Sequence, residues 1–252
     1  MLARQRPRLL EDYSENGPSL LDERILTFVF KSANWNPFLI CQCACVCKRL
    51  SELAKRLLWK EFCLSRAPKM MNDLLSGEIN GIINGGWNAL GKLMCFCAGC
   101  HTTRNFQCYP INGHFVRKTR FSCTSGRSFL VPQCRKDTLY VTDPCEHLDN
   151  DEDEDEDVGL FRGIIKSFAT SRTRRMLLEK GARLEQNEVC PFCRAEVWSL
   201  TQAQMIPPSA QRRLACYEDS LEYFICRNGH LHGMCSLLPI SDSEGLSEDE
   251  GC

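Results

Sequence analysis

Residues 20–62 read LLDERILTFVFKSANWNPFLICQCACVCKRLSELAKRLLWKEF, and this stretch decides the fold predicted for the N-terminal part of the chain. Apolar residues recur on one side of a first helix, at Leu21, Ile25, Phe28 and Val29. Pro37 suits the first turn of a second helix, because a residue there needs no backbone N–H donor. A third apolar stripe follows at Val46, Leu50, Leu53, Leu57 and Leu58 and ends in Trp59 and Phe62. The stretch therefore predicts three short helices.

A helical unit of about 43 residues lies at the lower limit of what buries its own core, so its exposed apolar residues would form an interface. The stretch resembles an F-box in its opening Leu20-Leu21, its core Val46-Cys47-Lys48-Arg49-Leu50 and its closing Leu58-Trp59. The Leu-Pro opening usual in an F-box is replaced by the leucine pair, with Pro18 two positions earlier. The alternative is an unrelated helical hairpin that ends in a core tryptophan.

The formal net charge of -1 hides a strong segregation of charge along the chain. Residues 149–157 hold eight acids and residues 241–252 hold five, with no lysine or arginine in either segment. Without these two segments the chain carries a net charge of +12. The folded body is therefore predicted to be basic, and the run 149–157 to be an exposed loop, because neighbouring like charges repel and need solvent.

Eighteen cysteines among 252 residues point either to disulfides or to metal, depending on the compartment. The N-terminus has no apolar core of signal-peptide length, and the longest uncharged run, residues 32–47, is too short to span a bilayer. We expect a soluble intracellular chain with reduced thiols and no membrane contact. In that setting, paired Cys-x-x-Cys motifs favour metal over disulfides.

Two cysteine groups look like copies of one zinc-binding plan, a Cys-x-x-Cys turn followed later by a strand that carries a cysteine and a histidine. The predicted ligands are Cys97, Cys100, Cys145 and His147 in the first set, and Cys190, Cys193, Cys226 and His230 in the second. Gly229 permits the chain reversal that brings Cys226 and His230 together. His232 and Cys235 are alternative fourth ligands in the second set. Cys95, His101, Cys108, Cys123 and Cys134 compete in the first set.

The remaining pattern predicts an α+β protein, a three-helix F-box followed by a Cys/His-rich α+β region stabilised by zinc. We expect a helix over 70–80, two or three strands between 115 and 141, helices over 158–169 and 172–183, and a strand over 221–226. Alternating cysteines at 41, 43, 45 and 47 are expected to be small apolar fillers. The predicted segments are a flexible arm 1–17, the F-box 18–64, a first Cys/His-rich half 65–148, an acidic loop 149–157, a second half 158–240 and an acidic tail 241–252.

Residues 18–240 as a whole resemble the plant family of the phytochrome-A-associated F-box protein, the "empfindlicher im dunkelroten Licht"-like proteins. The resemblance rests on the F-box stretch and on the motifs CFCAGC, YVTDPCEHL, CPFC and ICRNGHLHG. It implies a non-catalytic substrate receptor of a Skp1-cullin-F-box ubiquitin ligase that acts in light or hormone signalling. The expected compartment is the nucleus, with the cytoplasm as a second location. The residues that the resemblance assigns to Skp1 binding are Leu20, Leu21, Ile25, Leu26, Val46, Cys47, Leu50 and Trp59.

Three other functions compete with this interpretation. A zinc-stabilised nucleic-acid-binding protein is favoured by the basic body and by the arginines between 172 and 183, but the zinc motifs lack a finger helix at the usual spacing. A RING domain interleaves eight ligands over a shorter span than the one found here. A catalytic cysteine is disfavoured because it needs a neighbouring base in an open cleft.

Overall fold

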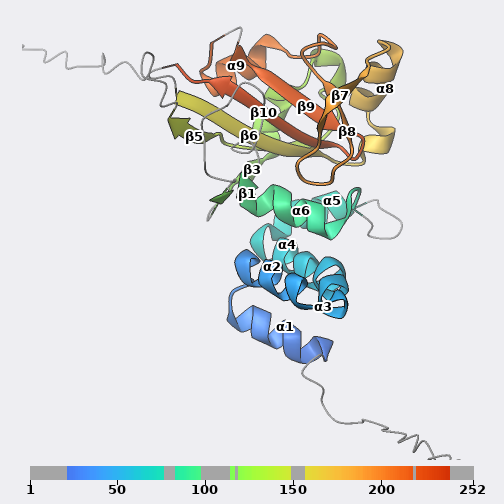
Figure 1. The fold of residues 1–252 in the computed structure, drawn as a ribbon. Helices are drawn as coiled ribbons and strands as arrows, with labels where there is room; N and C mark the ends of the chain where they lie inside the picture. The colour runs from blue at the N-terminus through green and yellow to red at the C-terminus, as the bar shows by residue number, and fades with distance from the viewer. Residues whose placement is uncertain are drawn as a thin grey trace, which may run out of the picture.

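The computed structural model describes residues 22–76, 83–97, 114–116, 119–148, 157–217 and 220–238. The N-terminal helices form a column below a β-sheet that the rest of the chain builds (Figure 1). The predicted arm 1–17, residues 149–156 of the acidic loop and the tail 241–252 lie outside the described residues. Within the described part, the helices are too short or too polar to cross a membrane.

The N-terminal part is helical, as its apolar stripes predict. The helices are α1 Glu23–Ser32, α2 Pro37–Val46, α3 Lys48–Leu53, the π-helical η1 Ala54–Leu58, α4 Trp59–Arg66, α5 Pro68–Leu75 and α6 Gly86–Cys95. Pro37 opens α2 as predicted, and the Asn36 side chain accepts a hydrogen bond from the Phe38 N–H at 2.9 Å. The segments α3, η1 and α4 follow one another directly, so the third predicted helix continues to Arg66.

The C-terminal part is built on an antiparallel sheet, so the predicted α+β class is confirmed. Its strands are β3 Phe121–Ser122, β4 Leu139–Thr142, β5 Cys145–Leu148, β6 Asp157–Ile165, β7 Leu184–Val189, β8 Glu196–Ser199, β9 Glu222–Cys226 and β10 His230–Ser236. Their order is β3-β4-β6-β10-β9-β8-β7, and β5 pairs with the first half of β6. A separate two-stranded sheet joins β1 Phe96–Cys97 to β2 His114–Phe115. Strands from both sides of the acidic run therefore share one sheet.

Short helices complete the C-terminal part. They are α7 Cys123–Gly126, η3 Arg127–Phe129, η4 Pro132–Cys134, η5 Phe168–Thr170, α8 Arg172–Glu179 and α9 Pro208–Leu214. The predicted helix over the arginine cluster is thus confirmed as α8, and the predicted strand before Cys226 is confirmed as β9.

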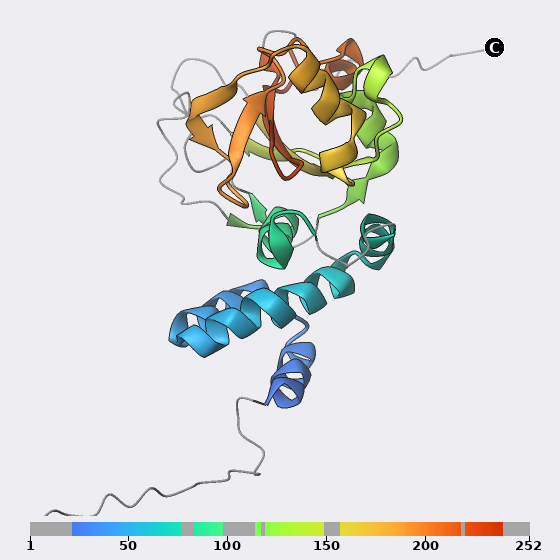
Figure 2. The ribbon, with the colours of Figure 1, turned by 90° about the vertical axis from the view of Figure 1, so that its right-hand side faces the viewer.

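The two faces of the sheet pack in two separate cores. Phe224 faces one core, with Trp59 and Leu90 of α4 and α6, whereas its neighbours Tyr223 and Ile225 face the other. The second core lies against α8, α9 and the turns η3 and η4. Figure 2 shows the blue to green helices α1 to α6 on one side of the sheet only. The first core therefore joins the N-terminal helices to the sheet.

The prediction of a helix over 158–169 is wrong, because residues 157–165 form the strand β6. Phe161 and Ile165 are buried in one core and Ile164 in the other, so β6 is covered on both faces. A strand buried on both sides reads as a nearly continuous apolar run, which periodicity does not separate from a buried helix.

The two or three strands expected between 115 and 141 are confirmed, because β2 ends at Phe115 and β3 and β4 lie on either side of the turns η3 and η4. One smaller expectation needs correction. Cys45 and Cys47 are exposed at the end of α2, so they are not buried fillers, whereas Cys41 and Cys43 are half-buried against the first core.

Candidate metal centre and docking face

Two β-hairpins bring the second predicted ligand set together. The turn between β7 and β8 carries Cys190 and Cys193, and the turn between β9 and β10 carries Cys226 and His230. The Arg194 N–H donates to the Cys190 carbonyl at 2.8 Å, which folds the first turn around its two thiols. The Gly229 N–H donates to the Cys226 carbonyl at 2.8 Å with φ at +84°, so the predicted reversal at this glycine is confirmed.

The donor atoms of these four residues lie within 4.8 Å of one another. The Cys193 and Cys226 sulfurs are 3.7 Å apart, and the His230 Nδ1 lies 3.3 to 3.8 Å from the three sulfurs. With Zn–S near about 2.3 Å and Zn–N near about 2.0 Å, a tetrahedral site needs edges of about 3.8 Å and about 3.5 Å. The cluster therefore has the spacing and the soft donor set of a site that can hold a metal ion.

The electrostatics of the cluster also favour a cation. Hydrogen bonds from Cys190 and Cys226 lower the pKa of the Cys193 thiol, while hydrogen bonds with Cys190 and Cys193 raise the pKa of Cys226. Hydrogen bonding with Cys193 raises the pKa of Cys190 to about 12. A bound divalent ion would favour the ionised form of all three thiols.

Neighbouring donors support the sulfurs from outside the cluster. The Asn228 and His230 backbone N–H groups donate to the Cys226 sulfur at 3.4 and 3.3 Å, and the Asn228 side-chain amide donates to the Cys193 sulfur at 3.4 Å. Hydrogen bonds of this kind hold metal ligands in place and stabilise thiolate charge. Asn228 was not anticipated from the sequence, although its place between two ligands in one turn is a usable signal.

The two alternative ligands of the second set lie elsewhere. The His232 ring stacks on Phe224 with ring centroids 5.3 Å apart, and the Cys235 thiol donates to the Gly159 carbonyl at 3.6 Å. Among the described residues, the group able to hold a metal consists of Cys190, Cys193, Cys226 and His230 alone.

The first predicted ligand set is only partly described. Cys97 and Cys145 lie in one small apolar cluster with Val158 and Leu160. Cys100 and the side chain of His147 lie outside the described residues, as do the competing His101 and Cys108. Cys145 and His147 lie within the single strand β5, whereas Cys226 ends β9 and His230 begins β10 across a hairpin turn, so the second half does not repeat the first in this respect. The first zinc set stays a prediction.

The first two helices expose a group of large apolar side chains. Phe28 is 70% exposed and Val46 is 73% exposed, and the group also contains Val29, Phe38 and Leu39. Phe38 and Leu39 were missed in the sequence, although they directly follow the proline that opens α2. Large exposed apolar groups on a small helical unit mark a surface that another protein covers. We call these five residues the apolar docking face.

The residues predicted for Skp1 contact divide into four groups. Val46 and Cys47 are exposed, and Ile25, Leu26 and Leu50 are half-buried. Trp59 is 3% exposed and stands edge-on to Phe62, so it is a core residue and not a surface contact. Leu20 and Leu21 lie outside the described residues.

The two ends of the acidic run lie away from the basic helix α8. The flanking residues of the run, Leu148 and Asp157, pair with each other at one end of β6. The helix α8, which carries the arginines, follows the opposite end of β6. On α8, Arg172 pairs with Glu179 at 2.7 Å, which reduces its availability to an acidic partner.

A helical unit with exposed apolar side chains is thus joined to an α+β part that holds a Cys/His cluster able to bind a metal. The chain matches the family described as the EID1-like F-box protein 2 C-terminal domain over residues 102–236. It is 56% identical to EID1-like F-box protein 2 of Arabidopsis thaliana over 229 residues, which cover 90% of this chain and 91% of that protein. It is 44% identical to EID1-like F-box protein 3 of the same plant over 247 residues, covering 98% and 88%. The chain belongs to the EID1-like F-box protein family.

The resemblance to the phytochrome A-associated F-box protein of Arabidopsis thaliana is more distant. The identity is 29% over 122 residues, which cover 46% of this chain and 34% of that protein. The predicted membership is therefore confirmed at the level of plant F-box proteins, but the relatives that match most of the chain carry the EID1-like name. No solved structure matches the chain.

Proposed function

We propose that this protein is the substrate-receptor subunit of a Skp1-cullin-F-box ubiquitin ligase and has no catalytic site of its own. The apolar docking face on α1 and α2 carries the proposal, because it gives the F-box of this family member a surface for a Skp1-like protein. The F-box would span residues 18–64, and the C-terminal part would hold a target protein for ubiquitination. Transfer would be accelerated by proximity and orientation.

The proposal also covers where and in which pathway the protein acts. One Arabidopsis relative is named for its association with phytochrome A, which supports a role in plant light signalling or a related hormone response. Receptors of nuclear signalling pathways work in the nucleus, and we propose the same compartment for this chain, with the cytoplasm as a second site.

Zinc is the metal that we propose for the Cys190, Cys193, Cys226 and His230 cluster. Three sulfurs and one imidazole nitrogen at tetrahedral spacing form a closed donor set, which is typical of structural zinc and leaves no position for a reacting water. The role of the ion would be to join the two hairpins. We propose a second zinc at Cys97, Cys100, Cys145 and His147 on the sequence pattern.

Placing charge on the apolar docking face tests the proposed function. Phe28→Asp combined with Val46→Asp should abolish co-purification of a plant Skp1-like protein with the chain. Each buried apolar side chain is worth about 1.5–3 kcal/mol, so losing both should weaken binding by roughly a hundred-fold or more. Co-expression followed by pull-down and calorimetry measures the change. Both residues are exposed in the free chain, so the variant should still fold.

A matched control uses exposed leucines of the C-terminal part. Leu178→Asp combined with Leu238→Asp adds the same charge at exposed apolar positions, where Leu178 is 51% exposed. This variant should hold the Skp1-like protein as the wild type does. Wild-type binding by the Phe28 and Val46 variant would show that the docking face has another role.

A further inference from the structure

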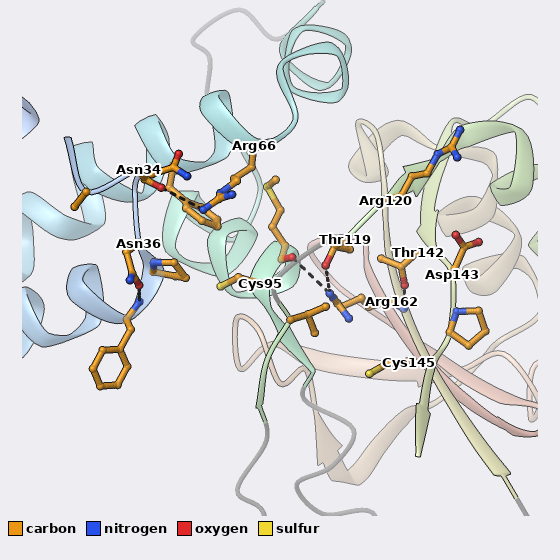
Figure 3. A pocket seen from close by; sticks show the side chains of 17 residues that line it. Asn34, Asn36, Arg66, Cys95, Thr119, Arg120, Thr142, Asp143, Cys145 and Arg162 are labelled. Atoms are coloured by element: carbon orange, nitrogen blue, oxygen red, sulfur yellow. Dashed lines mark hydrogen bonds between the residues drawn. The ribbon is translucent and has the colours of Figure 1, made fainter. Parts of the chain in front are cut away.

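A cleft of about 1010 Å³ opens between the N-terminal helices and the sheet (Figure 3). Its walls come from the turn between α1 and α2, the end of α6, the connection from β4 to β5, and β6. Three arginines line it: Arg66 at the end of α4, Arg120 before β3, and Arg162 in β6. Apolar side chains lie between them: Pro37, Phe62, Met94, Val116 and Pro144.

Arg162 is a buried cation at the wall of this cleft, and only 4% of its surface is exposed. Its Nε donates to the Leu93 carbonyl at 2.5 Å, and its Nη2 donates to the Thr119 hydroxyl at 2.8 Å and the Met94 carbonyl at 3.5 Å. All three acceptors are neutral. Burial lowers the pKa of the Arg162 guanidinium, but arginine stays protonated at any physiological pH. It forms no ion pair with a described carboxylate.

No described carboxylate pairs with any of the three arginines of the cleft. Arg120 is exposed and, within the described part of the chain, has no ion-pair partner. Arg66 donates to the Asn34 carbonyl at 3.2 Å and lies over the Phe62 ring, which again supplies no negative charge. Among the described lining residues Asp143 is the only acid, and its carboxylate is bound to Arg213 at 3.1 Å.

The described lining residues include three arginines and a single acid. The cleft therefore combines net positive charge with apolar wall surface. A buried cation without a counter-ion is costly, and an incoming carboxylate would relieve that cost.

We infer that this cleft is the docking site for an acidic, partly apolar peptide segment of the protein substrate. The inference rests on the proposed receptor function and adds the chemistry that the receptor recognises. Carboxylates of the segment would pair with Arg120 and Arg66 at the mouth and approach Arg162 at the wall, while apolar side chains would cover Met94 and Val116. Because the cleft adjoins the F-box helices, a segment held there would lie next to the ligase scaffold.

Peptide selection tests this inference on the full chain purified with a plant Skp1-like protein. A randomised dodecapeptide phage library should yield binders enriched in Asp and Glu, interspersed with apolar residues. Fluorescence anisotropy then measures the recovered peptides against the charge variant Arg66→Gln combined with Arg120→Gln. We expect binding to weaken about a hundred-fold, since each of the two lost hydrogen bonds to a charged group is worth about a factor of ten. Both residues are exposed, so folding should be unaffected, unlike with a substitution at Arg162.

The control variant is Arg175→Gln combined with Arg212→Gln, which removes the same charge from exposed positions outside the cleft. It should change affinity by less than about two-fold at physiological salt, where distant charges are screened. Equal weakening by both variants, or recovered peptides without acidic enrichment, would overturn the inference. Tight binding of a peptide copied from residues 149–157 at the same cleft would show that the chain's own acidic run is the occupant, and would overturn it too.

The test also separates this inference from the proposed function. If the chain fails to hold the Skp1-like protein, the receptor proposal is wrong, and the selection is then run on the chain alone. If the Skp1-like protein is held but acidic peptides are not selected, the receptor proposal stands and only the cleft assignment is lost.

Discussion

Gly85, which directly precedes α6, lies against the Cys/His cluster. Its φ is +81°, and a Cβ added there would lie 2.7 Å from the His230 Cε1 and 3.3 Å from the Cys193 Cβ. Gly86 has the same φ of +81°, but a Cβ there would meet nothing within 4 Å. A side chain at either position would strain the backbone equally, but only a side chain at Gly85 would also clash with His230 and Cys193. Comparing the two substitutions therefore separates the effect of the clash from that of the backbone.

Gly85→Ala should therefore weaken zinc binding, whereas Gly86→Ala should not. Both substitutions should cost about 1–2 kcal/mol of stability for the left-handed backbone, and Gly85→Ala about 1–3 kcal/mol more for the clash. Metal analysis should find zinc in the wild type, and a chelator competition should remove it more readily from the Gly85 variant. Equal chelator resistance in both variants, or zinc-free wild-type protein grown with ample zinc, would contradict this expectation.

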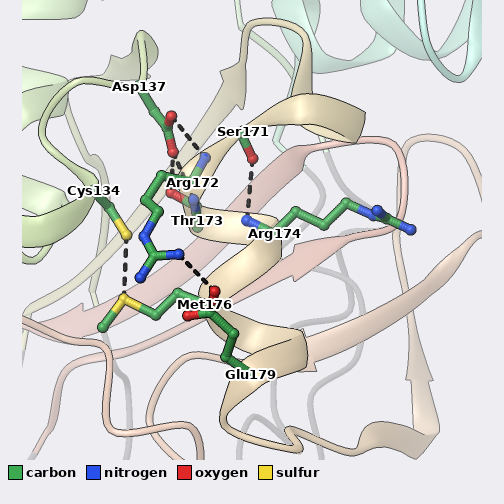
Figure 4. Close-up of polar contacts among 8 residues, drawn as sticks. All are labelled: Cys134, Asp137, Ser171, Arg172, Thr173, Arg174, Met176 and Glu179. Carbon is green, nitrogen blue, oxygen red and sulfur yellow. Dashed lines mark hydrogen bonds and ion pairs between the residues drawn. The ribbon is translucent and has the colours of Figure 1, made fainter.

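The N-terminus of α8 shows how one element depends on a residue far away in the sequence (Figure 4). The Asp137 carboxylate accepts hydrogen bonds from the Arg172 and Thr173 backbone N–H groups at 2.9 and 2.7 Å, and from the Thr173 hydroxyl at 2.7 Å. Ser171 adds a local cap by accepting from the Arg174 N–H at 3.1 Å. A carboxylate at this position also interacts favourably with the helix dipole.

Asp137→Ala should therefore destabilise the protein by about 2–3 kcal/mol, since it removes two backbone caps and a favourable charge. Chemical denaturation followed by circular dichroism measures the loss. Asp143→Ala serves as the control, because that exposed carboxylate makes one surface ion pair with Arg213 and should cost less than about 1 kcal/mol. Equal losses in the two variants would show that the Asp137 cap is not a stabilising contact.

The whole molecule is held together by a core that the helices and the metal cluster share. Cys190 and Cys226 are buried in the same core as Trp59 and Leu90. Hydrogen bonds also join the helices to the sheet. The Asp73 carboxylate of α5 accepts from the Lys166 ammonium at 3.0 Å and from the Tyr140 hydroxyl at 2.9 Å. Losing the metal should then affect both parts of the chain and not only the C-terminal sheet.

Metal removal should raise hydrogen exchange in the β7–β8 and β9–β10 hairpins and in α6. The helix α8, on the opposite face of the sheet, should stay better protected. The physical reason is that bound zinc contributes on the order of 10 kcal/mol to a small site, so its loss opens the elements that pack on that site first. Hydrogen–deuterium exchange with mass spectrometry, before and after chelation and after zinc is restored, measures this. Unchanged protection of α6 would show that the junction does not depend on the metal.

The sequence by itself determined the features that depend on near neighbours. Pro37 and Asn36 fixed the start of α2 through local backbone chemistry, and the Cys-x-x-Cys and Cys-x3-His spacings pointed to the four residues whose donor atoms the structure brings within 4.8 Å of one another. These signals act within a few residues, so no knowledge of the sheet is needed to read them.

Only the tertiary structure decided which surfaces each segment faces. Residues 158–165 became a central strand because β10, β4 and β5 pair with them and both faces are covered, and the same apolar spacing would have suited a helix. Trp59 was placed in the core by Gly91, whose missing side chain leaves room for the indole ring. Arg162 reached the cleft wall because β6 lies beside the end of α6, nearly seventy residues earlier in the chain. Such contacts join residues distant in sequence, and local pattern carries no information about them.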